Sequence, residues 1–168
     1  MESKNTTRIT AEKGKQEFFI EREFDAPREL VFSAFNEADL LLQWLGPDDM
    51  KMKVEKLDNK SGGSYRFLHS HCNGGPEFGF NGVIHEVKEP ERIIRTFEFE
   101  GLLERGHVSL EFLTLIALPN NRCKLHIQSV FKSVEDRDGM LQSGMEGGMN
   151  EGFRKLDLLL AMSISKVK

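Results

Sequence analysis

The sequence is poor in cysteine, tryptophan and tyrosine, with two, one and one of these residues among 168. Cys72 and Cys123 are too few to build a disulfide framework, which excludes the small disulfide-stabilised class of domain. A folded chain of this length buries roughly 70% of the surface that its unfolded form exposes. We therefore expect a single domain that is stabilised by its own apolar core.

Long apolar runs and an excess of positive charge are also missing. The apolar stretch at residues 158–162 is too short to cross a bilayer, and the polar residues 1–12 do not resemble a secretory signal. The 23 basic and 27 acidic residues give a formal net charge of −4, which argues against a general nucleic-acid-binding surface. These absences predict a cytoplasmic protein that binds no nucleic acid and does not insert stably into a membrane.

Phenylalanine, by contrast, is abundant, with 13 residues in the chain. Its ring carries no hydrogen-bonding group, so such rings are suited to a dry environment. We therefore expect a large apolar interior that these rings fill or line.

The first part of the chain predicts one strand followed by two short helices. Residues 1–15 have no periodicity and are expected to form a flexible tail. Apolar residues then alternate over residues 18–24, which is the spacing of a strand. Residues 27–35 begin with a proline, which suits a first helical turn, and continue at helical spacing. Residues 38–44 predict a second helix, which a Gly-Pro pair ends.

The rest of the chain predicts six more strands and one long helix. Alternating segments recur six times between residues 50 and 130, and turns rich in Gly, Pro and Asn separate them. Five glycines lie within residues 139–152, and each costs about 1 kcal/mol in a helix interior. We therefore expect the final helix to be loose or broken there and regular from about Asn150. Its apolar stripe, at steps of 4, 4, 3 and 4, consists of Met145, Met149, Phe153, Leu156 and Leu160.

These elements predict an α+β fold over residues 16–168. Strands that follow one another with short turns form an antiparallel meander, here a curved sheet of seven strands. One face of that sheet must be covered, and the C-terminal helix is the only predicted element long enough to cover it. A twisted sheet that curls around one helix leaves a space between the two.

Several segments also resemble, in the same order, those of one known family. They are Glu23-Phe24-Asp25-Ala26-Pro27-Arg28-Glu29-Leu30, Trp44-Leu45-Gly46-Pro47, Gly62-Gly63-Ser64-Tyr65-Arg66-Phe67, Gly82-Val83-Ile84-His85-Glu86-Val87 and Gly148-Met149 with Gly152-Phe153. They resemble the activator of heat-shock-protein-90 ATPase-like family, within the START-like (SRPBCC, Bet v-type) superfamily. The resemblance covers residues 16–162. It implies a helix-grip fold, in which a curved sheet grips a C-terminal helix around a hydrophobic cavity that binds lipids, sterols or polyketides.

The sequence departs from this family at three aromatic positions. Many relatives carry Trp where this chain has Gln43, Phe97 and Met149. Each change removes an indole N–H donor. The resemblance therefore implies a cavity that is more purely apolar than in those relatives.

Ten residues are expected to surround a ligand between the sheet and the final helix. Tyr65 and Ser129 are the expected polar anchors, whereas ordinary core packing is the alternative interpretation of the apolar members. Met140, Met145 and Met149, with the nearby glycines, suggest an adaptable gate. The expected ligand-binding residues are Trp44, Tyr65, Phe67, Phe80, Phe97, Phe112, Ser129, Met145, Met149 and Phe153.

No catalytic or metal-binding residue is expected. His69 and His71 share one face of a strand and precede Cys72, but no further ligand lies nearby in the sequence. Cys123 and His126 fall on opposite faces of one strand and cannot form a nucleophile–base pair. The period-two pattern also places two carboxylates on the outer face of the sheet, those of Glu98 and Glu111.

The sequence therefore predicts a small-hydrophobic-ligand binding protein, with a lipid, sterol or polyketide-like ligand and no cofactor. An enzyme of the cyclase, aromatase or hydrolase type is one alternative, because the same fold carries such activities. A chaperone- or protein-interaction module is another. The expected assembly is a monomer or a weak homodimer.

Overall fold

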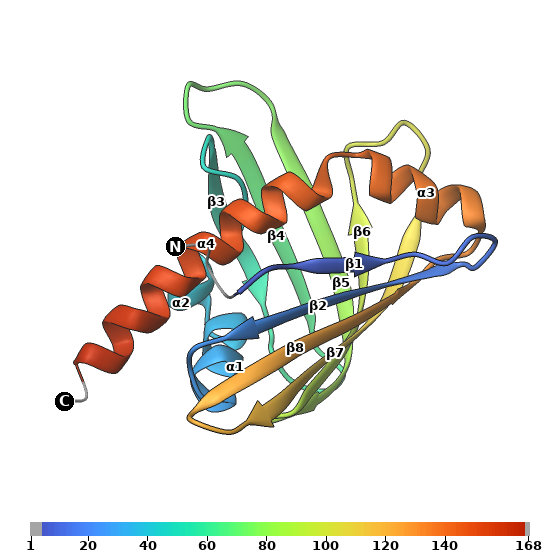
Figure 1. Cartoon of the computed structure of the whole chain (residues 1–168). Helices are drawn as coiled ribbons and strands as arrows, with labels where there is room; N and C mark the ends of the chain where they lie inside the picture. Colours follow the sequence, from blue (N-terminus) through green and yellow to red (C-terminus); the bar gives the residue numbers. More distant parts are fainter. Residues whose placement is uncertain (1–4, 167–168) are drawn as a thin grey trace.

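A computed structural model describes residues 5–166 as one antiparallel sheet wrapped around a long helix (Figure 1). The elements are β1 (Arg8–Thr10), β2 (Glu17–Phe24), α1 (Arg28–Asn36), α2 (Ala38–Leu41), β3 (Met50–Leu57), β4 (Ser64–His71), β5 (Glu77–Lys88), β6 (Arg92–Phe99), β7 (Val108–Leu118), β8 (Arg122–Val130), α3 (Val134–Gln142) and α4 (Met145–Ser165). The expected α+β class and the meander from β3 to β8 are confirmed.

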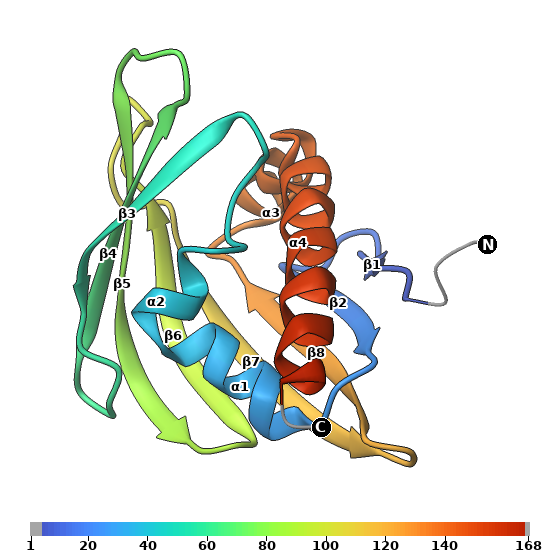
Figure 2. The ribbon, with the colours of Figure 1, turned by 90° about the vertical axis from the view of Figure 1, so that its left-hand side faces the viewer.

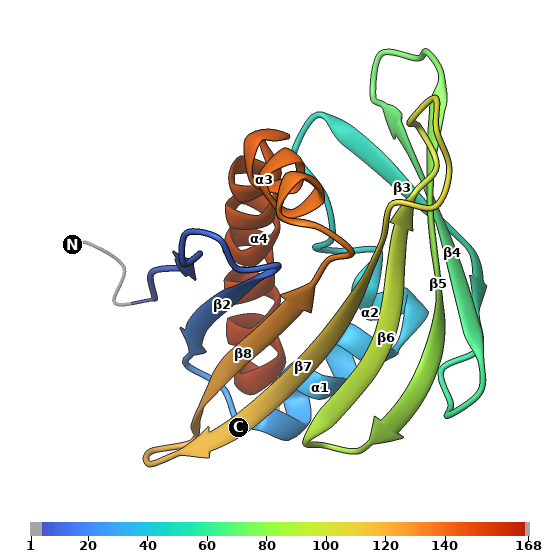
Figure 3. The same ribbon diagram turned by 90° about the vertical axis from the view of Figure 1, so that its right-hand side faces the viewer.

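The sheet has the strand order β1-β2-β8-β7-β6-β5-β4-β3, and every neighbouring pair is antiparallel. It curves around α4, which lies across its concave face, while α1 and α2 occupy one end of the curve (Figure 2). The view from the opposite side shows the strands β8, β7 and β6 in front of α1 and α2 (Figure 3). The helix-grip arrangement expected from the resemblance is therefore present.

The sheet has one strand more than the seven predicted. β1 pairs with β2, with Ile9 opposite Ile20, and so forms an edge of the sheet. The expectation of a flexible tail over residues 1–15 is therefore wrong for Arg8–Thr10, and residues 1–4 lie outside the described part. A strand of three residues is too short to produce a recognisable alternation, which explains why the pattern missed it.

The alternating side chains of β2 give the strand one buried face and one more exposed face. On β2, Phe18, Ile20 and Phe24 are at most 4% exposed and face α4. From α4, Phe153 and Leu156 pack in one core with Phe24, and the ring of Phe153 meets that of Phe24 edge to face at 5.6 Å, whereas Phe18 and Ile20 form a second cluster with Phe131. Burial of large apolar side chains of this kind contributes about 1.5–3 kcal/mol each.

A buried ion pair also joins α4 to the sheet. Arg22 donates to both carboxylate oxygens of Asp157, at 2.9 and 2.6 Å. Its guanidinium carbon lies 4.6 Å from the ring centroid of Phe24 and 5.2 Å from that of Phe153. The one charged residue on the inner face of β2 is thus paired and stacked rather than left uncompensated.

The glycine-rich segment contains a break, as expected, but at a single point. Ser133 caps α3 by accepting a hydrogen bond from the Asp136 amide at 3.1 Å. α3 ends at Gln142, and Gly144 adopts a left-handed φ of 84° before α4 begins at Met145. The final helix therefore begins at Met145, and the expectation that it is regular only from about Asn150 is wrong.

Candidate functional site

A cavity of about 170 Å³ lies between the concave face of the sheet and the two C-terminal helices. It is located where β2, β6, β7 and β8 face the junction of α3 and α4. Its walls are Phe18, Ile20, Phe97, Ser109, Glu111, Ser129, Phe131, Met140, Met145 and Met149.

The floor of the cavity contains one row of residues that crosses four neighbouring strands. The pairing places Phe18 opposite Ser129, Ser129 opposite Glu111, and Glu111 opposite Arg95. Directly paired residues of an antiparallel sheet project to the same side. The row therefore presents a ring, a hydroxyl and an ion pair side by side to the interior.

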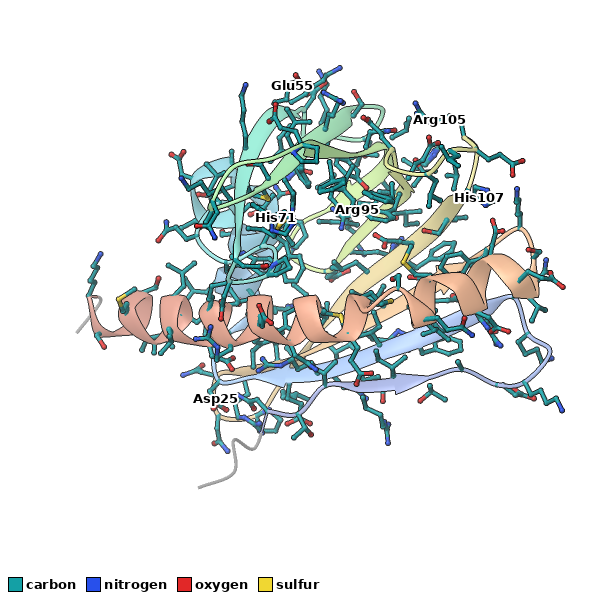
Figure 4. The ribbon with its side chains drawn as sticks, turned by 90° about the horizontal axis from the view of Figure 1, so that it is seen from above. Asp25, Glu55, His71, Arg95, Arg105 and His107 are labelled. Carbon is teal, nitrogen blue, oxygen red and sulfur yellow. The ribbon has the colours of Figure 1, made fainter. Side chains whose placement is uncertain are left out.

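Arg95 and Glu111 form this ion pair inside the curve of the sheet. The Nε atom of Arg95 donates to Oε2 of Glu111 at 3.0 Å, and the two side chains are 23% and 19% exposed. The Arg95 guanidinium carbon also lies 5.0 Å from the ring centroid of Tyr65. Figure 4 shows Arg95 on the inner side of the sheet, facing α4. The carboxylate of Glu111 lines the cavity, whereas Arg95 stands beside it and supports it.

Two serine hydroxyls complete the polar part of the floor. Ser109 is 3% and Ser129 is 2% exposed, and both line the cavity. Within residues 5–166, neither hydroxyl makes a side-chain hydrogen bond. A buried hydroxyl gains free energy when it is given a partner, so the cavity offers groups that a guest can satisfy.

Methionines form the opposite wall. Met140 comes from α3, and Met145 and Met149 come from the first turns of α4. All three are partly buried, so this wall separates the cavity from the outside with flexible side chains. Unbranched thioethers reshape easily around different contacts.

The expected ligand-binding residues divide into two groups in the structure. Phe97, Ser129, Met145 and Met149 line the cavity. Phe80 stands beside it, with its ring 5.6 Å from that of Phe97. Four other expected ligand-binding residues face the interior but pack in the core and do not line the cavity: Trp44, Tyr65, Phe67 and Phe153.

The two polar aromatic residues are already satisfied by the backbone. Trp44 donates from Nε1 to the carbonyl of Ala34 at 2.9 Å. Tyr65 donates its hydroxyl to the carbonyl of Thr96 at 2.6 Å, and burial raises the pKa of this phenol. Neither side chain lines the cavity, so the structure gives Tyr65 a structural hydrogen bond in place of the expected anchor role.

The predicted faces of β7 were reversed. Leu113 and Leu115 are 1% exposed and face the core, as does Ser109. Phe112 has the opposite parity and is paired with Ile94 and Gln128 on the outer face of the sheet. The expectation that Phe112 forms a wall of the cavity is therefore wrong.

The same reversal brings Glu111 inside, where the sequence pattern placed it outside. Glu98 does lie on the outer side, where it accepts a hydrogen bond from Arg105 at 2.5 Å. A cavity more purely apolar than in the Trp-containing relatives was expected; that comparison stays a prediction, and in this chain Glu111, Ser109 and Ser129 add polar groups to the walls. Leu113 and Leu115 share the inner face with Glu111, but the other face of β7 is apolar too, so the sequence of this strand alone carried no decisive signal.

The two histidines of β4 have different surroundings. His69 is 8% exposed, its ring is 4.8 Å from that of Phe80, and desolvation lowers its pKa. His71 is exposed and lies 3.6 Å from a carboxylate oxygen of Asp49. Across the described residues, no three His, Cys, Asp or Glu side chains gather as metal ligands do. In the same part of the chain, no helix is long and apolar enough to span a membrane.

A larger hollow, of about 390 Å³, lies at the end of β4 and β5 away from the cavity floor. It is built around Arg66, which donates to Glu100 at 2.9 and 2.7 Å and also to Glu55. The guanidinium lowers the pKa of Glu100 to about 2. Because these charges satisfy one another and the walls of this hollow are mostly polar, the smaller, mainly apolar cavity is the better candidate site.

Comparison with known proteins adds a family and a set of similar folds. The family model described as activator of Hsp90 ATPase homolog 1-like protein matches residues 25–161. A crystal structure of a protein from Rhodobacter sphaeroides is 25% identical, covers 92% of this chain and 98% of its own, and has a TM-score of 0.81. No curated protein matches the sequence.

Two further structures show the same fold. An NMR structure from Arthrobacter aurescens is 23% identical over 92% of this chain and 91% of that chain, with a TM-score of 0.81. The crystal structure of an AHSA1 protein from Silicibacter pomeroyi is 23% identical over 88% of this chain and 99% of that chain, with a TM-score of 0.69.

Proposed function

The chain belongs to the activator of Hsp90 ATPase homolog 1-like family, and on this basis we propose that it binds a small, mostly apolar molecule between the sheet and α4. Proteins of this fold commonly bind hydrophobic ligands, and the cavity beneath Met140, Met145 and Met149 is the observation that supports the same role here. Apolar walls supply affinity through burial, and a few polar groups orient the guest.

The volume of the cavity limits the size of the ligand. An apolar cavity of about 150 Å³ holds one benzene molecule, and this one measures about 170 Å³. A sterol or a long-chain lipid therefore needs the methionine wall to move outward. In the arrangement described, a single-ring molecule fits, and its few atoms set a dissociation constant in the roughly micromolar to millimolar range.

Binding of toluene, followed by saturation-transfer NMR and by titration calorimetry, tests this proposal. Ser129→Leu places extra side-chain volume in the cavity, so we expect it to abolish toluene binding. Gln128→Leu is the matched control, because the neighbouring residue on β8 lies on the other face of the sheet and its change leaves the cavity intact. The thermal unfolding midpoint of each variant shows that it is folded.

Failure of toluene to bind the unaltered protein would refute the proposal. Equal binding by the Ser129→Leu variant would also refute it, because the molecule would then occupy some other place. Loss of binding in both variants would refute the assignment to this cavity.

A further inference from the structure

We infer that the ligand of this cavity is an uncharged single-ring aromatic molecule with a hydrogen-bond donor, of the phenol or aromatic N–H type, which it directs at Glu111. The inference rests on the proposed function and specifies the chemistry of its ligand. Three features of the cavity lead to it: an unused acceptor, a neutralised charge and flat apolar walls.

The unused acceptor belongs to the carboxylate of Glu111. Its Oε2 atom accepts from Arg95 at 3.0 Å, and no protein donor within the described residues reaches its Oε1 atom. Ser129, the next residue along the floor, is 2% exposed and has no hydrogen-bond partner for its hydroxyl in that same part of the chain. Neither Ser129 Oγ nor Glu111 Oε1 is among the fully buried side-chain atoms without a partner in that part of the chain, so both atoms are accessible from the cavity. A guest or a water molecule in the cavity can therefore donate a hydrogen bond to them.

The charge balance of the floor favours a neutral guest. Arg95 already neutralises Glu111 across their 3.0 Å contact, so a buried cation would have no counter-charge of its own. An anion would lie nearer to the carboxylate, which lines the cavity, than to the guanidinium, which does not. A hydroxyl or an aromatic N–H satisfies the acceptor without adding a net charge.

The walls favour a flat ring above this polar floor. Phe18 and Phe131 lie with their ring centroids 5.3 Å apart at one side of the cavity, and Phe97 stands at the other. Met145 and Met149 face them from α4, and sulfur makes favourable contacts with aromatic rings. The volume of about 170 Å³ admits one such ring.

Four probes of similar size separate these features: phenol, toluene, benzoate and benzylamine. We expect phenol to bind about ten- to hundredfold more tightly than toluene, which corresponds to about 1.4–2.8 kcal/mol and is the contribution of a hydrogen bond to a charged acceptor. Benzoate and benzylamine are expected to bind at least tenfold more weakly than phenol. Titration calorimetry of the unaltered protein at pH 7 gives all four constants.

Glu111→Gln tests the residue that the inference names. It keeps the size of the side chain but removes the charge, so we expect the ratio of phenol to toluene affinity to fall at least fivefold. Glu98→Gln is the matched control, because Glu98 pairs with Arg105 on the outer side of the sheet, and its ratio should match that of the unaltered protein. If the Glu111 variant does not fold, Ser129→Ala gives a second test, with weaker phenol binding and unchanged toluene binding expected.

The possible failures are distinguishable. Equal affinities for phenol and toluene would overturn the inference and leave the proposed function in place. Tighter binding of benzoate or benzylamine would overturn the neutral-ligand assignment. An unchanged ratio in the Glu111→Gln variant would overturn the assignment of Glu111 as the acceptor. Failure of toluene to bind the unaltered protein would refute the proposed function itself.

Discussion

Gly139 and Gly147 occupy helices without any steric reason to be glycine. Gly139 lies within α3 and Gly147 within the first turn of α4. A Cβ atom added at either position would meet no other atom within 4 Å, and neither residue has a positive φ. Glycine weakens a helix by about 0.5–1 kcal/mol relative to alanine. The double variant Gly139→Ala/Gly147→Ala should therefore raise the free energy of unfolding by about 1–2 kcal/mol.

For a chain of this length, that change raises the thermal unfolding midpoint by roughly 2–8 °C. Calorimetry measures the shift, and urea denaturation gives the free energy independently. Gly144→Ala is the contrasting control, because its φ of 84° is strained for alanine and should lower stability by about 1–2 kcal/mol. An unchanged or lower midpoint in the double variant would refute the reasoning, since it would mean that these glycines are needed for packing.

The same pair of substitutions tests whether the methionine wall acts as a gate. Met140 and Met145 lie within two residues of the substituted positions, so stiffer helices should slow ligand entry and release. Amide hydrogen exchange should show weaker protection over residues 139–152 than over α4 beyond Phe153. Equal protection of the two segments would exclude a gate in this place.

Three further predictions follow from buried groups. Asp157→Ala leaves Arg22 buried without its partner and should cost about 2–3 kcal/mol in urea denaturation, below the value for a fully buried pair because Asp157 is 30% exposed. The lowered pKa of His69 means that the unfolded chain binds more protons as pH falls below about 6.5, so stability should decrease from pH 7 to pH 5, and His69→Gln should reduce this decrease. Burial raises the pKa of the Cys123 thiol to about 12, so only Cys72 should react rapidly with a thiol reagent at pH 8, and both should react after unfolding.

Each of these has an internal control. Arg154→Ala removes an exposed ion pair with Asp48 and should change stability by less than about 1 kcal/mol, so an equal effect would contradict the importance of the buried pair. His71→Gln, at an exposed position of the same strand, is the comparison for removing a histidine as such. Two rapidly reacting thiols in the folded protein would show that Cys123 is accessible.

The sequence predicted the architecture well because its apolar periodicity is strong. The stripe from Met145 to Leu160 and the alternation on β2 each have one clear phase, so helix and strand faces followed directly. On β7 both faces of the strand carry apolar residues. Val108, Leu110 and Phe112 lie on one face. The other face begins with Ser109 and Glu111 and continues with Leu113 and Leu115. Local alternation then cannot decide which face is buried, and the pairing with neighbouring strands decides it.

The cavity could be predicted only in part for a related reason. Tyr65 and Phe67 face the interior as expected and Phe112 does not, and whether a ring lines a space or fills it depends on packing between distant segments. Trp44 and Tyr65 are held by carbonyls of Ala34 and Thr96, contacts that no sequence pattern indicated. Of the polar floor only Ser129 was predicted; Ser109 and Glu111 were missed because they interrupt the apolar pattern at the point where the binding site requires polarity.

The short strand β1 has a consequence for how the protein behaves at high concentration. It occupies the hydrogen-bonding edge of β2, and the Arg137 guanidinium donates at 2.5 Å to the carbonyl of Glu12 in the turn that joins the two strands. β1 covers Phe19–Glu21 of this edge, and without it the backbone groups that these residues direct away from β8 would be open to any extended chain nearby. A form shortened by its first 12 residues would therefore have an adhesive sheet edge, which favours self-association and aggregation.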